Sequence, residues 1–266
     1  MSVLKNKRNL SPVEYVFHFI KLYDFTANRL KKIPKRKYEY LGKPIISQMN
    51  KIQTIIMQIH NQYFVYGIKL KSKPEQVLEV INEIKKLNKP LIALWNIEKY
   101  PTVKMQKWLD MINKEIRYLK NIGGLSTLEG EEYMFILKYK KIDEMQFLKN
   151  MKYLHRFIYR KIISIPTNYR ETHGSLIIEL INEAFYRVLK ANNIYPTTKE
   201  EYIIRKQDIA IAMDCLQQLE PPVISLFLTL EFNEHTMRQW SRRINYEMKL
   251  LKGLQDSDEK NFGHLA

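Results

Sequence analysis

The sequence predicts an all-α protein made of two tandem up-down-up-down four-helix bundles. Three features lead to this fold class: few glycines, apolar residues that recur at helical spacing, and an internal repeat of 132 residues. The chain has 8 glycines in 266 residues, too few for the many tight turns of an all-β fold. Its length allows two domains, each able to bury a core of its own.

The repeat organises the chain, because a shift of 132 residues aligns its two halves without a gap. The coinciding identical pairs include Pro34 with Pro166, Gly42 with Gly174, Asn50 with Asn182, Pro90 with Pro222, Trp108 with Trp240 and Glu115 with Glu247. We therefore expect a first bundle over residues 1–122, a connector over 123–141 that opens with a Gly-Gly pair, and a second bundle with a short polar tail over 142–266. The role of the connector stays open.

The first helix of each half is indicated by apolar side chains along one helical face. In the first half this face carries Tyr15, Phe19, Leu22, Thr26, Leu30 and Ile33, and in the second half Phe147, Met151, Leu154, Ile158, Ile162 and Ile165. Pro34 and Pro166 follow directly. Because proline interrupts helical hydrogen bonding, we expect this helix to end there.

The second helix is expected to follow Gly42 or Gly174 and to run to about residue 66 or 192. The third begins near Pro74 in the first half and after Thr197-Thr198 in the second, where two glutamates follow. Threonine before an acidic first turn is typical of a helix start.

Prolines interrupt the third helix of both halves, at Pro90 and at Pro221-Pro222. An interior proline removes one hydrogen bond and clashes with the preceding turn. We expect a kink that the bundle uses. The alternative is a complete break, which would give five helices in each half.

The fourth helix follows Pro101 or Asn233. Its apolar face carries Met105, Trp108, Ile112, Ile116 and Leu119 in the first half, and Met237, Trp240, Ile244, Met248 and Leu251 in the second. Because both tryptophans lie among aliphatic residues at helical spacing, we expect them in the two cores rather than as platforms for nucleic-acid bases.

The net charge of +16 favours a polyanionic partner. An A/T-rich genome would also raise the lysine content, but it would raise the lysine content of both halves equally. Residues 1–122 contain 24 Lys and Arg against 9 Asp and Glu, whereas residues 123–266 contain 20 against 19. This asymmetry favours a function for the charge.

Two groups of basic residues are the candidate nucleic-acid contacts in the first half. The turn cluster consists of Arg29, Lys31, Lys32, Lys35, Arg36, Lys37 and Lys43, and the stripe on the fourth helix consists of Lys107, Lys114 and Arg117. A merely solvated basic surface is the alternative for both. Tyr38 and Tyr40 lie within the turn cluster, where stacking on unpaired bases and plain packing are equally consistent with the sequence.

The sequence lacks the patterns of a catalytic or metal site. Its histidines are scattered, and it has no glycine-rich phosphate loop and no serine nucleophile elbow. Helical RNA-cleaving domains carry an Arg followed four to six residues later by a His, a spacing that Arg170 and His173 do not have. Cys215, the single cysteine, is expected to be an inert thiol. We expect a non-enzymatic protein without cofactor or metal.

The expected location is the cytoplasm. A single cysteine allows no internal disulfide, which suits a reducing compartment. The basic start of the chain is not followed by the apolar segment of a secretory signal, and no apolar run approaches the roughly 20 residues that cross a bilayer. We therefore expect no membrane partner.

The turn between the first two helices carries Ile33-Pro34-Lys35, then Leu41-Gly42 and Ile45. This pattern resembles the turn of a four-helix-bundle family that includes the accessory variability determinant of diversity-generating retroelements and the small proteins encoded in intervening sequences of bacterial 23S ribosomal RNA. Its turn has the form Pro-Lys, an Arg four residues after the Pro, and Leu-Gly three residues later. The first half matches with Pro34-Lys35 and Leu41-Gly42 but has Tyr38 at the Arg position.

The second half keeps another part of the same turn. It retains Pro166, Arg170 and Gly174 and departs from the pattern at Thr167 and His173. The resemblance thus covers both halves, and Arg170 joins the candidate nucleic-acid contacts through it. The departures put in doubt whether both halves use the turn alike.

The resemblance implies a basic accessory protein that binds a reverse transcriptase and its template RNA and supports cDNA synthesis without catalysing it. RNA is favoured over DNA, and the near-neutral second half suits a protein-facing role. Accessory determinants with a single bundle assemble as rings of five bundles. A chain with two linked bundles cannot build a ring of five from whole chains, because one bundle would remain outside the ring. Any self-association of this chain must therefore differ. The alternative function is a structural or defence-related protein-interaction module without a nucleic-acid ligand.

Overall fold

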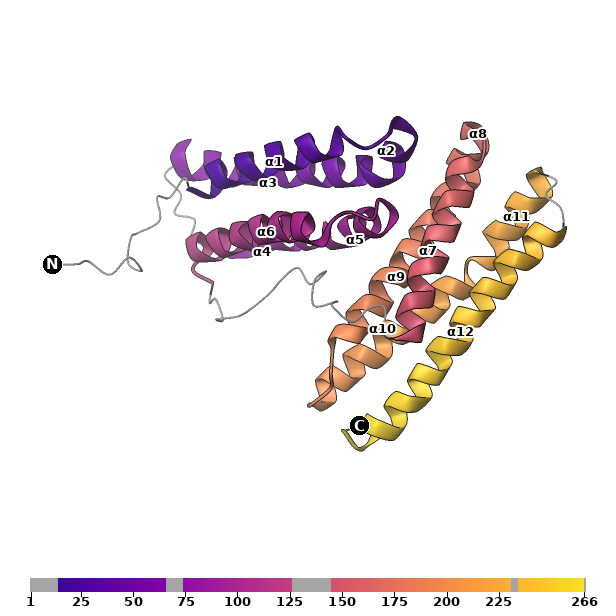
Figure 1. Cartoon of the computed structure of the whole chain (residues 1–266). Helices are drawn as coiled ribbons and strands as arrows, with labels where there is room; N and C mark the ends of the chain where they lie inside the picture. The colour runs from indigo at the N-terminus through magenta and orange to yellow at the C-terminus, as the bar shows by residue number, and fades with distance from the viewer. Residues whose placement is uncertain (1–13, 66–73, 126–144, 231–233, 266) are drawn as a thin grey trace. The chain divides into compact units, whose positions relative to one another are not determined.

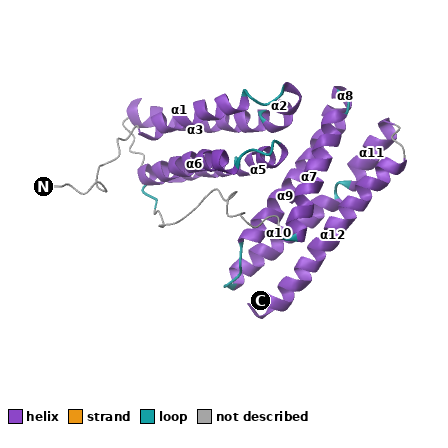
Figure 2. Cartoon of the chain, in the orientation of Figure 1, coloured by secondary structure: helices purple, strands orange, loops and turns teal. Residues whose placement is uncertain are grey.

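The computed structural model describes residues 14–65, 74–125, 145–230 and 234–265 (Figure 1). Every regular element in these ranges is a helix, which confirms the predicted all-α class (Figure 2). Within the same ranges, no helix combines the length and the hydropathy needed to cross a membrane.

The element order repeats along the chain. The first half contains α1 (Glu14–Leu30), α2 (Lys35–Leu41), α3 (Lys43–Val65), α4 (Pro74–Lys85), α5 (Asn88–Ile97) and α6 (Thr102–Gly123). The second half contains α7 (Gln146–Ser164), α8 (Thr167–Tyr169), the π-helical turn η3 (Arg170–Gly174), α9 (Ser175–Asn193), α10 (Lys199–Gln217), α11 (Glu220–Leu230), α12 (Glu234–Phe262) and the short 3₁₀ turn η4 (Gly263–Leu265). Apart from α4 and α10, corresponding helices start 132 residues apart.

Local sequence signals set most helix ends. Pro34 and Pro101 directly precede α2 and α6, where a missing amide hydrogen costs no helical bond. Thr198 caps α10, because its hydroxyl accepts a hydrogen bond from the Glu201 amide while the Glu201 carboxylate accepts one from the Thr198 amide. Gly124 ends α6 in the left-handed conformation, with φ at 66°.

The expectation of one kinked third helix is wrong, and the alternative of a break is confirmed. In the first half α4 ends at Lys85 and α5 begins at Asn88, and in the second half α10 ends at Gln217 and α11 begins at Glu220. The prolines therefore occupy the first turn of a new helix. Proline is tolerated there, since the first-turn amides have no partner within the helix.

The described helices divide into two compact units. The first unit contains α1 to α4 and α6, and the second contains α7 to α12 together with α5 from residue 89 onward. The sequence analysis predicted a first bundle over residues 1–122, which includes α5. The structure instead places most of α5 in the second unit. Most of the predicted connector lies outside the described residues.

Four long helices enclose the core of each unit. In the first unit α1 and α4 each pack against both α3 and α6, and in the second α7 and α10 each pack against both α9 and α12. Trp108 and Trp240 are buried in these cores, as expected from their spacing. Each meets a phenylalanine ring edge to face, Phe25 at 6.1 Å and Phe157 at 5.6 Å between ring centres. The two Phe–Trp pairs occupy equivalent positions in the repeat.

Candidate nucleic-acid interface

The turn cluster spans the end of α1, the short helix α2 and the start of α3 in the first unit (Figure 1). The sequence suggested a basic turn, but seven of its residues form a helix between Pro34 and Gly42. The side chains of Lys31, Lys32, Lys35, Arg36 and Lys43 are exposed, and those of Arg29 and Lys37 are half-buried. Most of the predicted cluster therefore faces solvent.

Four of these cations have no acidic partner in the described part of the chain. Among the described residues, no acidic side chain forms an ion pair with Lys31, Lys32, Lys35 or Arg36. Lys43 differs, since its ammonium group lies 3.0 Å from the Glu39 carboxylate. The four unpaired cations are thus the strongest local source of positive potential in the turn cluster.

The corner between α2 and α3 closes around Gly42. A methyl group in place of its hydrogen would collide with the ring of Tyr38, which lies against the glycine backbone. Tyr38 is half-buried by this contact. The structure thus favours packing over base stacking for Tyr38, and it explains why a glycine follows four residues later.

Arg170 is the counterpart of Tyr38 in the repeat and packs at the equivalent corner of the second unit. Its side chain is buried beside Gly174, and its guanidinium donates hydrogen bonds to the Thr167 hydroxyl at 2.8 Å and to the Ile163 carbonyl at 3.4 Å. These bonds tie α8 to the last turn of α7. A guanidinium buried in this way offers little surface to phosphate, so we remove Arg170 from the candidate contacts.

Lys107 of the fourth-helix stripe meets the turn cluster at Phe25. The Arg29 guanidinium lies 4.8 Å from the centre of the Phe25 ring, and the Lys107 ammonium lies 5.8 Å from it. Cations are attracted to the negative face of an aromatic ring and stay available to solvent on the other side. The structure therefore brings α1 and α6 together into one basic surface.

Lys114 and Arg117 lie farther along the exposed face of α6. At a rise of 1.5 Å per residue they are about 10 and 15 Å from Lys107 along the helix. The Lys114 ammonium lies 5.5 Å from the Tyr118 ring centre. These two residues extend the basic surface but do not belong to its dense part.

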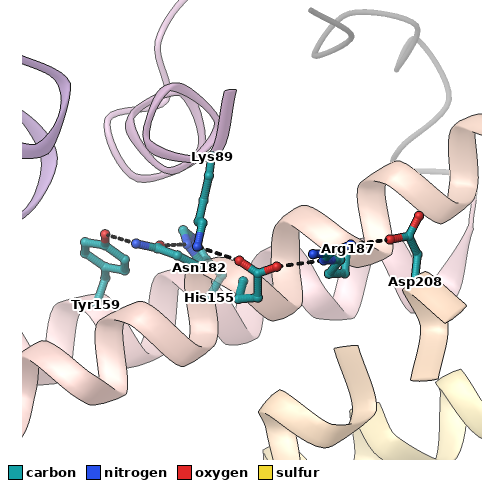
Figure 3. A network of polar contacts seen from close by, with 7 residues as sticks. Lys89, His155, Tyr159, Asn182, Arg187 and Asp208 are labelled. Carbon is teal, nitrogen blue, oxygen red and sulfur yellow. Dashed lines mark hydrogen bonds and ion pairs between the residues drawn. The ribbon is translucent and has the colours of Figure 1, made fainter. Parts of the chain in front are cut away.

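The second unit contains a polar network that sequence reasoning missed (Figure 3). Glu183 pairs with Lys89 and Arg187, and Arg187 also donates to Asp208 at 2.7 Å. On the same helix, the side-chain oxygen of Asn182 accepts a hydrogen bond from His155 Nε2 at 2.9 Å, and its amide nitrogen donates to the Tyr159 hydroxyl at 3.1 Å. Glu183 and Arg187 are four residues apart on α9, but the other contacts join different helices, so periodicity could not reveal them.

The chemistry of this network is structural. Burial holds the pKa of His155 down to about 4, so its imidazole is neutral at pH 7. Hydrogen bonds from Lys89 and Arg187 hold the pKa of Glu183 below its usual value against the opposing effect of burial. A neutral histidine and paired carboxylates provide no poised base or nucleophile.

The cysteine and the acidic side chains do not form a metal site in the described part of the chain, where no group of three metal-binding side chains lies close together. Cys215 is buried, and burial raises the pKa of its thiol. A thiol of this kind is mostly protonated at pH 7 and is a poor nucleophile.

Comparisons of the chain with models of protein families, with curated proteins and with solved structures found no match.

Proposed function

We propose that the chain is a non-catalytic nucleic-acid-binding protein whose contact surface lies on the first unit. The observation that carries the proposal is the group of exposed cations Lys31, Lys32, Lys35 and Arg36, which form no ion pair with the described residues. Arg29 and Lys107 extend this group onto α6. Nucleic-acid phosphates bind such groups because each contact releases condensed counterions. The contacts are of the backbone-positioning kind, which carries little sequence specificity.

The unequal charge of the two halves supports this choice of surface. Residues 1–122 carry a balance of +15 and residues 123–266 a balance of +1, from 24 against 9 and 20 against 19 charged residues. In the second unit, acids neutralise cations at close range: Asp208 alone pairs with Arg187 and Lys190. The second unit is therefore the part better suited to a protein partner.

The resemblance of the α1–α2–α3 turn extends the proposal to a specific process. By it, the two units are copies of one four-helix bundle, and the chain binds a reverse transcriptase and its template RNA and supports cDNA synthesis. RNA is the favoured ligand. A reverse-transcriptase gene beside the gene for this chain would support this extension, and primer extension by that enzyme with and without the chain would test it.

The binding proposal is tested by a matched pair of charge variants. Lys35→Gln with Arg36→Gln changes the turn cluster, and Lys199→Gln with Lys249→Gln removes the same charge from exposed positions of the second unit. Binding of a fluorescent structured RNA and of a DNA duplex is measured at one moderate salt concentration. We expect the first variant to bind several-fold more weakly than the second. Equal losses would contradict the proposed surface.

A groove in the second unit favours a second candidate function, that of a protein-interaction module. The groove has a volume of about 350 Å³ and lies among α10, α11 and α12. Its lining includes Ile224, Met237, Ile244 and Met248. Flexible methionines beside branched aliphatic residues suit apolar side chains of a partner. Wild-type protein that binds neither RNA nor DNA would favour this candidate.

A further inference from the structure

Helix α5 is held on the second unit by polar contacts at both of its ends. Near its start, Lys89 pairs with Glu183 of α9 (Figure 3). Near its end, the Asn96 amide donates to the Lys152 carbonyl of α7 at 3.2 Å and lies 2.9 Å from His155 Nδ1. The α5 residues Lys89 and Asn96 thus form a docking face, and α7 with α9 forms its receiving face.

Arg156 completes this contact from the receiving side. Its guanidinium donates to the backbone carbonyl of Asn96 at 2.9 Å, and the ammonium of neighbouring Lys152 lies 5.6 Å from the Trp95 ring centre. Asn96 is fully buried by these interactions. The side-chain amide nitrogen and the backbone carbonyl of Asn96 thus both bond to α7.

The internal repeat supplies each face a second time. The counterpart of α5 is α11, on which Leu228 replaces Asn96 at the equivalent position. The counterpart of the α7–α9 face is the α1–α3 face, on which Ile20 replaces Lys152 and Tyr23 replaces His155. The α5 contact occupies the docking face of α5 and the receiving face of α7 and α9. The corresponding docking face of α11 and the corresponding receiving face of α1 and α3 remain.

The leftover faces are apolar and exposed. Leu228 is 77 % exposed on α11, and Phe17 and Ile20 are 62 % and 44 % exposed on α1. Leu228 stands where α5 has Asn96, and Ile20 stands where α7 has Lys152, so each leftover face carries an aliphatic side chain in place of a polar one. Burial of such side chains stabilises association by roughly 25 cal/mol per Å².

The charged residues of the leftover faces differ from those of the α5 contact. Pro221 replaces Lys89, with Glu220 exposed beside it at the start of α11. Lys51 replaces Glu183 on α3, and its ammonium lies 3.1 Å from the Glu83 carboxylate of α4. Asp24 replaces Arg156, so the guanidinium bond to the docked helix has no counterpart, and the apolar residues must contribute more.

We propose that α11 of one chain docks on the α1–α3 face of a second copy of the chain. The two faces differ, so the association is head-to-tail: each chain offers one docking face and one receiving face. This proposal is independent of the proposed nucleic-acid function. It concerns only faces that the repeat duplicates.

The test uses two variants that each remove one face. Leu228→Glu removes the docking face, and Phe17→Glu with Ile20→Glu removes the receiving face. Sedimentation equilibrium is measured on nuclease-treated protein in high salt, so that nucleic acid cannot bridge chains. We expect the wild type to associate with rising concentration, each variant to associate at least about tenfold more weakly, which corresponds to 1.4 kcal/mol, and an equimolar mixture of the two variants to form dimers and nothing larger.

The mixture gives the decisive result, because only one intact pair of faces remains in it. Ile203→Glu, at a side chain that is 40 % exposed on α10, is the control and should associate like the wild type. Circular dichroism checks that all variants fold. A monomeric wild type at all concentrations, or variants that associate as strongly as the wild type, would overturn the proposal.

Discussion

His18 and Glu115 meet inside the first unit, where the Nδ1 atom of His18 lies 2.7 Å from the Oε2 atom of Glu115. The equivalent residues of the second unit are Asn150 and Glu247, and the Asn150 amide donates to Glu247 at 2.6 Å. Both glutamates are fully buried. Burial raises the pKa of Glu115 to about 7 and that of Glu247 to about 8, against the opposing effect of their hydrogen bonds. Each unit therefore holds a buried carboxyl group whose pKa lies well above the ordinary value of 4.5.

Glu247→Gln is expected to stabilise the protein above pH 8. The pKa of Glu247 is higher in the folded state than its ordinary value of 4.5, so the folded state binds more protons between pH 4.5 and 8. The free energy of unfolding of the wild type therefore falls as pH rises through this window. Glutamine does not ionise, so the variant does not lose this free energy of unfolding as the pH rises. We expect a gain of up to about 5 kcal/mol at pH 9 and little change at pH 4, measured by urea unfolding.

The control for this experiment is Glu179→Gln, at an exposed position of α9. Its effect on the free energy of unfolding should be small and nearly the same at pH 4 and pH 9. If Glu247→Gln were destabilising at pH 9, the neutral form of Glu247 would not be the preferred one.

Trp108→Ala and Trp240→Ala are each expected to destabilise the protein by about 3–5 kcal/mol. Both indole rings are buried and pack on Phe25 and Phe157 in equivalent ways. Chemical unfolding measures the loss. An unchanged unfolding midpoint together with impaired RNA binding would instead identify the tryptophans as exposed stacking platforms.

Arg205→Met is expected to cost about 3–5 kcal/mol, because it leaves a buried carboxylate without its partner. Arg205 forms two hydrogen bonds to Asp258, at 2.6 and 2.9 Å, and both side chains are buried. The next residue, Lys206, pairs with Glu259 at the surface at 3.1 Å. Lys206→Met is the matched control and should cost much less, because solvent screens an exposed pair. Equal losses in thermal unfolding would show that burial does not strengthen the first pair.

The sequence predicted those parts of the fold that depend on local signals. Pro34, Gly42 and Pro101 marked helix ends because proline and glycine act on their own backbone. Pro90 was ambiguous, since proline either kinks a helix or starts a new one. The choice between them depends on the packing of Leu91 and Leu94, which are buried. Local pattern carries no information on such contacts.

The candidate site was predictable in composition but not in arrangement. The charge asymmetry selected Lys31, Lys32, Lys35 and Arg36, which are exposed in the structure. The meeting of Arg29 with Lys107 at Phe25 depends on the packing of α1 against α6. The burial of Arg170 was not foreseen either, although its counterpart Tyr38 lies against a glycine in the same way. That shared position, four residues before a glycine, was the available signal.

The salt dependence of RNA binding tests the proposed surface most directly. Lys31, Lys32, Lys35, Arg36 and Lys37 are changed together to Gln, and the matched variant changes Arg238, Arg242 and Arg243 of α12. Binding of structured RNA is measured at several salt concentrations, with circular dichroism as the folding control. We expect the first variant to flatten the slope of log affinity against log salt, by roughly 0.7–0.9 for each lost phosphate contact, and the second to change it little. An unchanged slope in the first variant, or a larger loss in the second, would contradict the placement of the nucleic-acid interface on the first unit.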